Sequence, residues 1–343
     1  MKKKSKYLIF FLASLIILIT ASILIQNNSE KTVQKNIEAI PLNYENIDVN
    51  FYYNQLNSTE KNVYDKIINN LNVYKGGEVV LDENISVNNL SRIADAVRFN
   101  NDNNYFYSLF TLPLTSDNKL VNWGTNQAKE ELEKMQISKI LLQLYIGEDD
   151  TRSDDFDLSD DLVIRNYDEK KKLFENIPNE LITEYESIKN ETNELLENII
   201  ANMPKNLNQE EAVNYFSQWL IDNMVYTDSF TYGTNYGDIT NPEIQFGSYL
   251  SSITNKSAIC SGLSMILSEL CRRVGIDSYI CLGTVSDGGS PFNHAWVAIV
   301  IGDTTYYKDP TREVAMKKIY PLIIEDELTK GNYLLRFSKH FNY

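Results

Sequence analysis

The sequence predicts an α+β protein, in which helices and an antiparallel sheet occupy separate stretches of the chain. Three observations point to this class. Apolar residues recur at helical spacing over several segments, and shorter runs rich in aromatic and β-branched residues are typical of strands. In addition, Gly302-Asp303 separates two such runs as the turn of a β-hairpin would. At 343 residues the chain is long enough for a sizeable core, and we expect two folded parts.

The N-terminal residues predict a membrane anchor. Residues 1–6 contain four lysines and precede residues 7–25, which carry no charge and have about the length of a bilayer-spanning helix. Positive charge before such a span places residues 1–6 in the cytoplasm and the folded part outside. A cleaved signal peptide is the alternative, because residues 20–22 are small, although apolar residues continue past them. In that case the protein would be secreted.

The next segments predict a spacer and a smaller folded region. Residues 26–50 are polar and aperiodic, whereas 51–165 have the pattern of a small α+β region. The elements expected within it are a helix from Ser58, a helix over about 86–97, and strands over 105–114 and 137–147. Nothing in this region resembles a catalytic constellation. Its acidic run, Glu148 to Asp161, lacks strict calcium-loop spacing and is interpreted as a solvated loop.

Residues 166–343 predict a helical segment followed by the domain that carries the chemistry. Apolar residues repeat at steps of three or four from 165 to 203, and Pro178 could mark a new helix start within this stretch. A further helix over 208–224 opens with Asn208 and has Glu211 three residues later, as a capping box does. A loop is expected over 226–249.

Scarce residue types narrow the candidates for catalysis. The chain has three cysteines and two histidines, and His340 lies three residues from the end, where chains usually fray. His294 lies in an apolar run, where an unpaired imidazole would be costly to bury. Cys271 and Cys281 occupy apolar positions on a helix and a strand, so we interpret them as buried free thiols rather than as a disulfide.

Cys260 begins a predicted helix that runs to Val274 and ends at Gly275. Apolar residues at steps of three and four define one face of this helix, and Cys260 precedes the first of them, Leu263, by three residues. The thiol therefore lies at the inward-facing N-terminus, where the helix dipole and free amides favour a thiolate. A small buried cysteine packed like alanine is the alternative interpretation.

His294 and Asp309 meet if the predicted hairpin forms. With Gly302-Asp303 as its turn, His294 lies opposite Thr311, and Asp309 is a diagonal neighbour at about 7–8 Å between backbones. A turn on Ile301-Gly302 would place the two directly opposite, whereas a three-residue loop would separate them onto opposite faces. Taken alone, Asp309 could also be a turn residue before a proline.

Cys260, His294 and Asp309 together predict a cysteine–histidine–aspartate triad. His294 would take the thiol proton, and Asp309 would hold the imidazole in its productive tautomer. The backbone N–H of Cys260 could donate to the oxyanion of a tetrahedral intermediate. Gln245 and Tyr249 are candidates for a further oxyanion donor, but they are more simply interpreted as packing or loop residues.

These motifs resemble the transglutaminase-like superfamily of cysteine enzymes. Cys260-Ser261-Gly262 at a helix start, His294-Ala295-Trp296 on one strand and Asp309-Pro310-Thr311 after the next carry the resemblance over about residues 200–325. It implies a papain-like core in which a catalytic helix packs on an antiparallel sheet, with Cys260 as nucleophile, His294 as base and Asp309 as orienting acid. Residues 58–110 are loosely similar to the N-terminal region of some bacterial membrane-anchored members.

The expected function is that of an extracytoplasmic cysteine peptidase or amidase acting on protein or cell-wall peptide bonds. A cross-linking transglutaminase uses the same triad and stays open, as does a non-catalytic cell-envelope module or an assembly factor that docks a partner through 165–203. We expect a protein or peptide substrate, membrane contact through the N-terminal helix, and no cofactor or metal. The 47 acidic residues against 32 basic ones, a net charge of −15, argue against a nucleic-acid partner.

Overall fold

The structure is a computed structural model that describes residues 37, 39–42, 48, 50–100, 108–121, 135–145, 157–175, 177–227, 249–286, 290–335 and 341. The chain divides into two compact units, residues 1–38 and 39–343, and every element below belongs to the second. Within the described ranges, no helix combines the length and apolar character needed to cross a bilayer; the predicted span, 7–25, lies outside these ranges.

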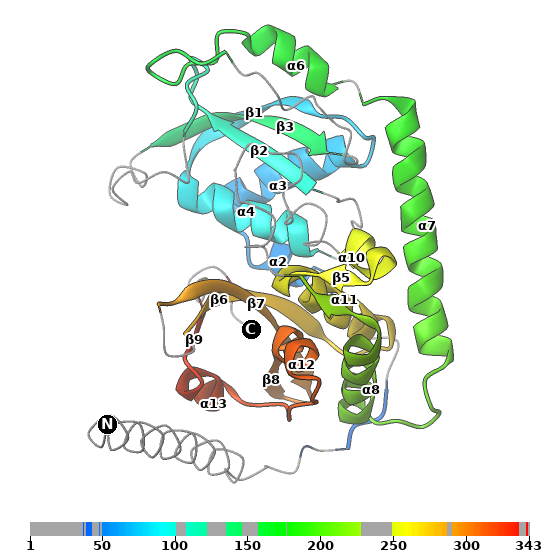
Figure 1. Cartoon of the computed structure of the whole chain (residues 1–343). Coiled ribbons are helices and arrows are strands. Elements are labelled where there is room, and N and C mark those ends of the chain that lie inside the picture. The colour runs from blue at the N-terminus through cyan, green and yellow to red at the C-terminus, as the bar shows by residue number, and fades with distance from the viewer. Residues whose placement is uncertain are drawn as a thin grey trace, which may run out of the picture. The chain divides into compact units, whose positions relative to one another are not determined.

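The expectation of mixed helices and antiparallel sheets is confirmed (Figure 1). The first sheet has the strand order β1-β3-β2 and contacts helices α3, α4 and α6. These elements, with the short helix α2, are α2 (Phe51–Asn54), α3 (Ser58–Leu71), β1 (Gly77–Ser86), α4 (Val87–Phe99), β2 (Ser108–Leu114), β3 (Gln136–Tyr145) and α6 (Tyr167–Glu175). The predicted helices and strands of this region are therefore present, whereas β1 was not predicted. Its pairing with β3 shifts register between Val80 and Ile85, which breaks the alternation by which a strand is recognised.

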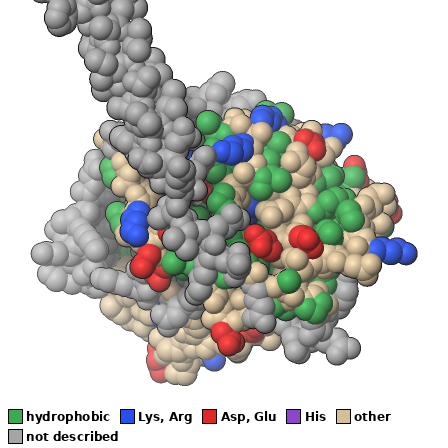
Figure 2. Space-filling view, turned by 90° about the horizontal axis from the view of Figure 1, so that it is seen from below, with side chains coloured by type: hydrophobic (Ala, Val, Ile, Leu, Met, Phe, Trp, Pro, Cys, Tyr) green, Lys and Arg blue, Asp and Glu red, His purple; other side chains and the backbone are tan. Residues whose placement is uncertain are grey.

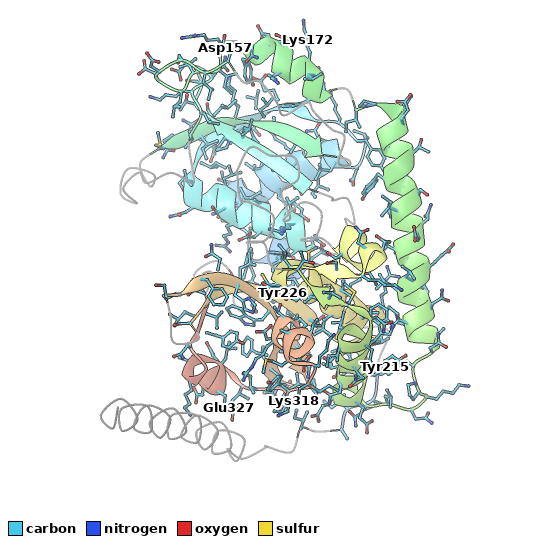
Figure 3. All side chains as sticks on the ribbon, in the orientation of Figure 1. Asp157, Lys172, Tyr215, Tyr226, Lys318 and Glu327 are labelled. Carbon is cyan, nitrogen blue, oxygen red and sulfur yellow. The ribbon has the colours of Figure 1, made fainter. Side chains whose placement is uncertain are left out.

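Capping explains why several helix starts could be predicted to within a residue. Three of the described helices begin at capping boxes, in which the N-cap side chain and the third helical residue exchange hydrogen bonds with each other's backbone. The N-cap residues are Asn57 for α3, Ser86 for α4 and Asn208 for α8 (Gln209–Asn223). The predicted segment 165–203 is divided into α6 and α7 (Asn179–Ala201) with Pro178 as the N-cap of α7, because proline has no N–H to continue a helix. Tyr215 of α8, labelled in Figure 3, donates to the carbonyl oxygen of Ile199 in α7 and joins the two helices.

The second sheet is antiparallel and has the order β8-β7-β6-β9. Its strands are β6 (Ser278–Val285), β7 (Phe292–Ile301), β8 (Thr304–Lys308) and β9 (Tyr333–Leu335), and the remaining elements are β4 (Val225–Tyr226), α10 (Tyr249–Asn255), β5 (Ser257–Ala258), α11 (Cys260–Arg273), α12 (Pro310–Met316) and α13 (Glu325–Lys330). Strands β4 and β5 form a separate parallel pair that leads into α11.

The hairpin between β7 and β8 turns where the sequence predicts. Ile301 pairs with Thr304, and Gly302 has a φ of +60°, which suits glycine in a tight turn. The ladder ends at the pair Val297 and Lys308, so the expectation that His294 faces Thr311 is wrong. Pro310 has no N–H for the ladder and instead starts α12, which turns the chain away from the sheet after Lys308.

Helix α11 packs against β6 and β7 through the apolar face that its sequence predicts (Figure 1). The four residues of that face are fully buried: Leu263, Leu267, Leu270 and Val274. Burial of each such side chain stabilises the fold by about 1.5–3 kcal/mol. Gly275, with a φ of +79°, ends the helix as predicted, and the N–H of Ile276 bonds back to the carbonyl of Cys271. This packing fixes where the helix begins, and therefore where Cys260 lies.

The short helix α2 is attached to the second sheet. The hydroxyl of Tyr52 accepts the N–H of Ile280 at 2.6 Å and donates to the carbonyl of the same residue at 3.2 Å. In the described part of the chain, strand β9 pairs with Gly283 to Val285, and Tyr52 satisfies backbone groups of β6 at Ile280, outside that stretch. Residues near the start of the second unit thus share one buried core with the sheet that carries His294. On the face seen in Figure 2, the described Lys and Arg side chains are spread among acidic and apolar ones.

Candidate active site

Cys260 is the first residue of α11 and is partly exposed. The preceding residue, Ile259, is the N-cap, and among the described residues no side chain caps this end of the helix. The first hydrogen bond of the helix runs from the N–H of Leu263 to the carbonyl of Ile259 at 3.1 Å. The earlier amides of the turn have no acceptor within the helix, and they form the partly positive end that favours an anion.

His294 lies on β7, buried, and connects the other two predicted residues. Its Nε2 bonds Asp309 Oδ2 at 2.9 Å, and the ring also interacts with the Cys260 side chain, for which Nδ1 remains. The ring of Trp296, two residues along the strand, stacks beside the imidazole, with the ring centroids 6.1 Å apart and the ring planes at 29°. The structure thus brings Cys260, His294 and Asp309 together in the predicted order.

The charge on His294 is stabilised by its two neighbours. Burial disfavours the imidazolium and lowers the pKa, but the hydrogen bonds to Asp309 and Cys260, together with their negative charges, outweigh burial and raise the pKa of His294 to about 10. The arrangement therefore favours a protonated imidazole beside the Cys260 side chain, and an imidazolium is the partner that a cysteine nucleophile needs.

Asp309 is both the partner of His294 and the N-cap of α12. Its Oδ1 accepts the N–H groups of Thr311 at 3.0 Å and Arg312 at 3.1 Å, while Oδ2 accepts from His294. Burial raises the pKa of this carboxyl, yet the donors from His294 and Tyr333 and the backbone hydrogen bond from Arg312 hold it below its usual range. Asp309 therefore fits both sequence interpretations: it precedes Pro310 and caps the turn into α12, and it also bonds the imidazole of His294.

Tyr333 is a site residue that the sequence did not indicate. It lies on β9 and its hydroxyl donates to Asp309 Oδ2 at 2.6 Å. Its ring reaches toward β7 across β6, where Gly283 is the residue paired with His294. A glycine inside an apolar strand is a signal for close approach of another group, and Gly283 is the only hint of Tyr333 that the sequence contains.

A second unpredicted contact comes from the first sheet's helices. Arg98, in the last turn of α4, donates from Nη2 to Ser261 Oγ at 3.4 Å. Ser261 is the residue next to Cys260, so a guanidinium from the region 51–165 lies beside the start of α11. No local pattern connects these segments, because they lie 163 positions apart in the chain.

The other predicted residues lie away from the site or outside the described ranges. The interpretation of Cys271 and Cys281 as buried free thiols is confirmed, and burial raises the pKa of Cys271 to about 12 and that of Cys281 well above its usual range. Gln245 and His340 are outside the described residues, and Tyr249 lies in α10 with its side chain undescribed. In the part of the chain that the structure describes, no cluster of three or more His, Cys, Asp or Glu could hold a metal ion.

Comparison with known proteins identifies the region that contains the site. Residues 194–309 match the model of the transglutaminase-like superfamily. Similar solved structures are a candidate cysteine protease from Cytophaga hutchinsonii (21% identity, TM-score 0.28, covering 38% of this chain and 40% of that one) and a protein named as a TGase (16% identity, TM-score 0.29, covering 52% and 41%). The chain therefore spans about two fifths of the length of each. None of the curated proteins compared with the chain matches it.

Proposed function

We propose, from the premise that residues 194–309 are a transglutaminase-like domain, that this protein is a thiol acyl-transfer enzyme with Cys260, His294 and Asp309 as its catalytic triad. The observation that carries the proposal is the buried His294 ring, which is hydrogen-bonded to Asp309 Oδ2 at 2.9 Å and interacts with the side chain of Cys260 at the start of α11. A buried imidazole between a thiol at a helix start and an ionised carboxylate has the geometry required of a general base.

The reaction follows from the positions of these groups. The Cys260 thiolate attacks the carbonyl carbon of an amide, a C–S bond forms, and the carbonyl π electrons move to oxygen. The Cys260 N–H, at the uncapped helix end, donates to this oxyanion. The oxyanion then collapses as the C–N bond breaks, and the imidazolium of His294 gives its proton to the departing amine. A thioester remains on Cys260, and His294 is neutral again.

Water is the preferred acceptor of the acyl group. His294 removes a proton from water, which attacks the thioester, and the C–S bond breaks to release a carboxylic acid and the Cys260 thiolate. Water is abundant outside the membrane, where the N-terminal segment is expected to place the domain. The proposed activity is therefore that of a peptidase or amidase on protein or cell-wall peptides, with cross-linking through a lysine amine as the alternative.

The acyl-enzyme can be tested without knowledge of the substrate. With p-nitrophenyl acetate, we expect a burst of nitrophenolate and an acetyl group on Cys260, located by mass spectrometry of peptides after acid quench. Cys260→Ala should lose both. Adding cadaverine distinguishes the acceptors, because a transglutaminase would transfer the acetyl group to the amine and a hydrolase would release acetate. Equal bursts from the wild type and Cys260→Ala would eliminate the proposed function.

The proposed location rests on the charge pattern of residues 1–25, with four lysines before an uncharged span. We propose that residues 7–25 hold the enzyme at the outer side of the cell membrane. In intact cells, a protease added outside should then degrade the domain, and membrane fractions should retain it. Recovery of a shortened chain from the medium would support a cleaved signal instead, and protection of the domain from the protease would contradict both.

A further inference from the structure

Four hydrogen-bond donors converge on the carboxylate of Asp309. Two are backbone N–H groups of α12, from Thr311 and Arg312, and both bind Oδ1. The other two are side chains on separate strands, His294 on β7 and Tyr333 on β9, and both bind Oδ2. The position of Oδ2, and with it the orientation of the imidazole, thus depends on Tyr333 as well as on His294.

The Tyr333 hydroxyl can donate its proton to Asp309 alone among the described groups that it contacts. The phenol oxygen interacts with the side chain of Arg312, which can only donate, so the hydroxyl hydrogen is left for Asp309. Burial and the neighbouring carboxylate raise the pKa of Tyr333 far above the physiological range. Tyr333 is therefore a permanent donor to Asp309 rather than a group that titrates.

Packing against neighbouring rings positions the aromatic ring of Tyr333. It is buried and packs edge-on against Trp296, with the ring centroids 5.3 Å apart, and it lies 6.2 Å from the ring of His294. Strand β9 is fixed by pairing Tyr333 with Val285 of β6. Since residues 194–309 end at Asp309, Tyr333 comes from a part of the chain that lies beyond the matched domain.

We propose that Tyr333 is a positioning residue of the site: its hydroxyl fixes Oδ2 of Asp309 and keeps this carboxylate ionised, so that His294 presents Nδ1 to Cys260. The inference rests on the proposed function. Among the described residues, the charged or titratable groups that interact around Asp309 are His294 from β7, Tyr333 from β9 and Arg312 from α12, with Cys260 of α11 on the far side of His294.

Tyr333→Phe removes the hydroxyl and keeps the ring. The matched control is Tyr307→Phe, because Tyr307 is also buried, lies on β8 of the same sheet, and makes no side-chain hydrogen bond to Asp309 among the described residues. We measure the rate of Cys260 alkylation by iodoacetamide from pH 4 to 8 in the full chain. The acid limb is the low-pH part of this profile, over which the alkylation rate rises with pH. Its midpoint should move up by about one pH unit in Tyr333→Phe, because the charged form of Asp309 loses a hydrogen-bond donor. It should stay in place in Tyr307→Phe.

A second measurement reads the hydrogen bond itself and does not depend on the thiol. In a His340→Gln background, His294 is the only histidine, and NMR of its Nε2–H reports exchange with water. We expect faster exchange in Tyr333→Phe than in the background protein or in Tyr307→Phe, at equal melting temperature.

The two measurements separate this inference from the proposed function. An acid limb and an exchange rate unchanged by Tyr333→Phe would overturn the role of Tyr333 even if Cys260 is catalytic. A second outcome is faster exchange in Tyr333→Phe together with equal alkylation profiles for the wild type and His294→Ala. It would support the placement of Asp309 by Tyr333 and would contradict the proposed thiol enzyme.

Discussion

Replacement of His294 by alanine should slow alkylation of Cys260 roughly a hundredfold at pH 6, because an ordinary thiol with a pKa of about 8.5 is thiolate in only about 0.3% of molecules at that pH. In the wild type, we expect His294, whose pKa is raised to about 10 by Asp309 and Cys260, to hold the proton that the attacking thiol gives up. The variant has no such acceptor. Its rate should therefore rise with pH as that of a free thiol does.

The sign of the pH dependence follows from the direction of the His294 shift. Since its pKa is raised, the imidazolium that stabilises the thiolate is fully present near neutral pH and is lost as the pH rises through about 10. The rates of wild type and His294→Ala should therefore converge toward pH 10. His340→Ala is the control and should follow the wild type. Cys260→Ser should show almost no labelling, because Cys271 and Cys281 are buried. Identical profiles for the wild type and His294→Ala would rule out the triad.

Lys308→Met should destabilise the fold by about 3–5 kcal/mol, because it leaves a buried carboxylate without its partner. Lys308 Nζ lies 2.9 Å from Glu313 Oε1, and both side chains are 1% exposed. The ammonium also donates to the carbonyl of Tyr320 at 2.6 Å and to Asn214 Oδ1 at 3.1 Å. Lys308 precedes Asp309 directly and Glu313 lies on α12, so loss of the pair should also disturb the end of the sheet that carries the site.

Urea denaturation with a matched surface pair measures this effect. Arg165 and Asp157 lie 3.4 Å apart with side chains 60% and 56% exposed, so Arg165→Met should cost less than about 1 kcal/mol. The double replacement Lys308→Met with Glu313→Leu should recover part of the stability lost by the single one, because neither charge of this pair then remains buried. A single replacement at Lys308 that costs no more than Arg165→Met would show that the buried pair does not stabilise the fold.

Much of the site could be predicted because its determinants are local. Cys260 stands at a helix start that the apolar steps of α11 define, and Gly302-Asp303 sets the register that places Asp309 near His294. Capping patterns located two helices, those near Ser58 and Asn208, in the same way. The expected pairing of His294 with Thr311 was wrong. It assumed that the strand pairing set by the turn continues past Lys308, whereas Pro310 ends the pairing and starts α12.

The sequence by itself determined which residues could form the triad, since residue scarcity, helix periodicity and hairpin register all act over short stretches of chain. Only the tertiary structure decided what surrounds these residues. Tyr333 reaches Asp309 from a three-residue strand 24 positions later, and Arg98 reaches Ser261 from another sheet's helix. Such contacts depend on how layers pack, and packing leaves no periodic signal in a single sequence.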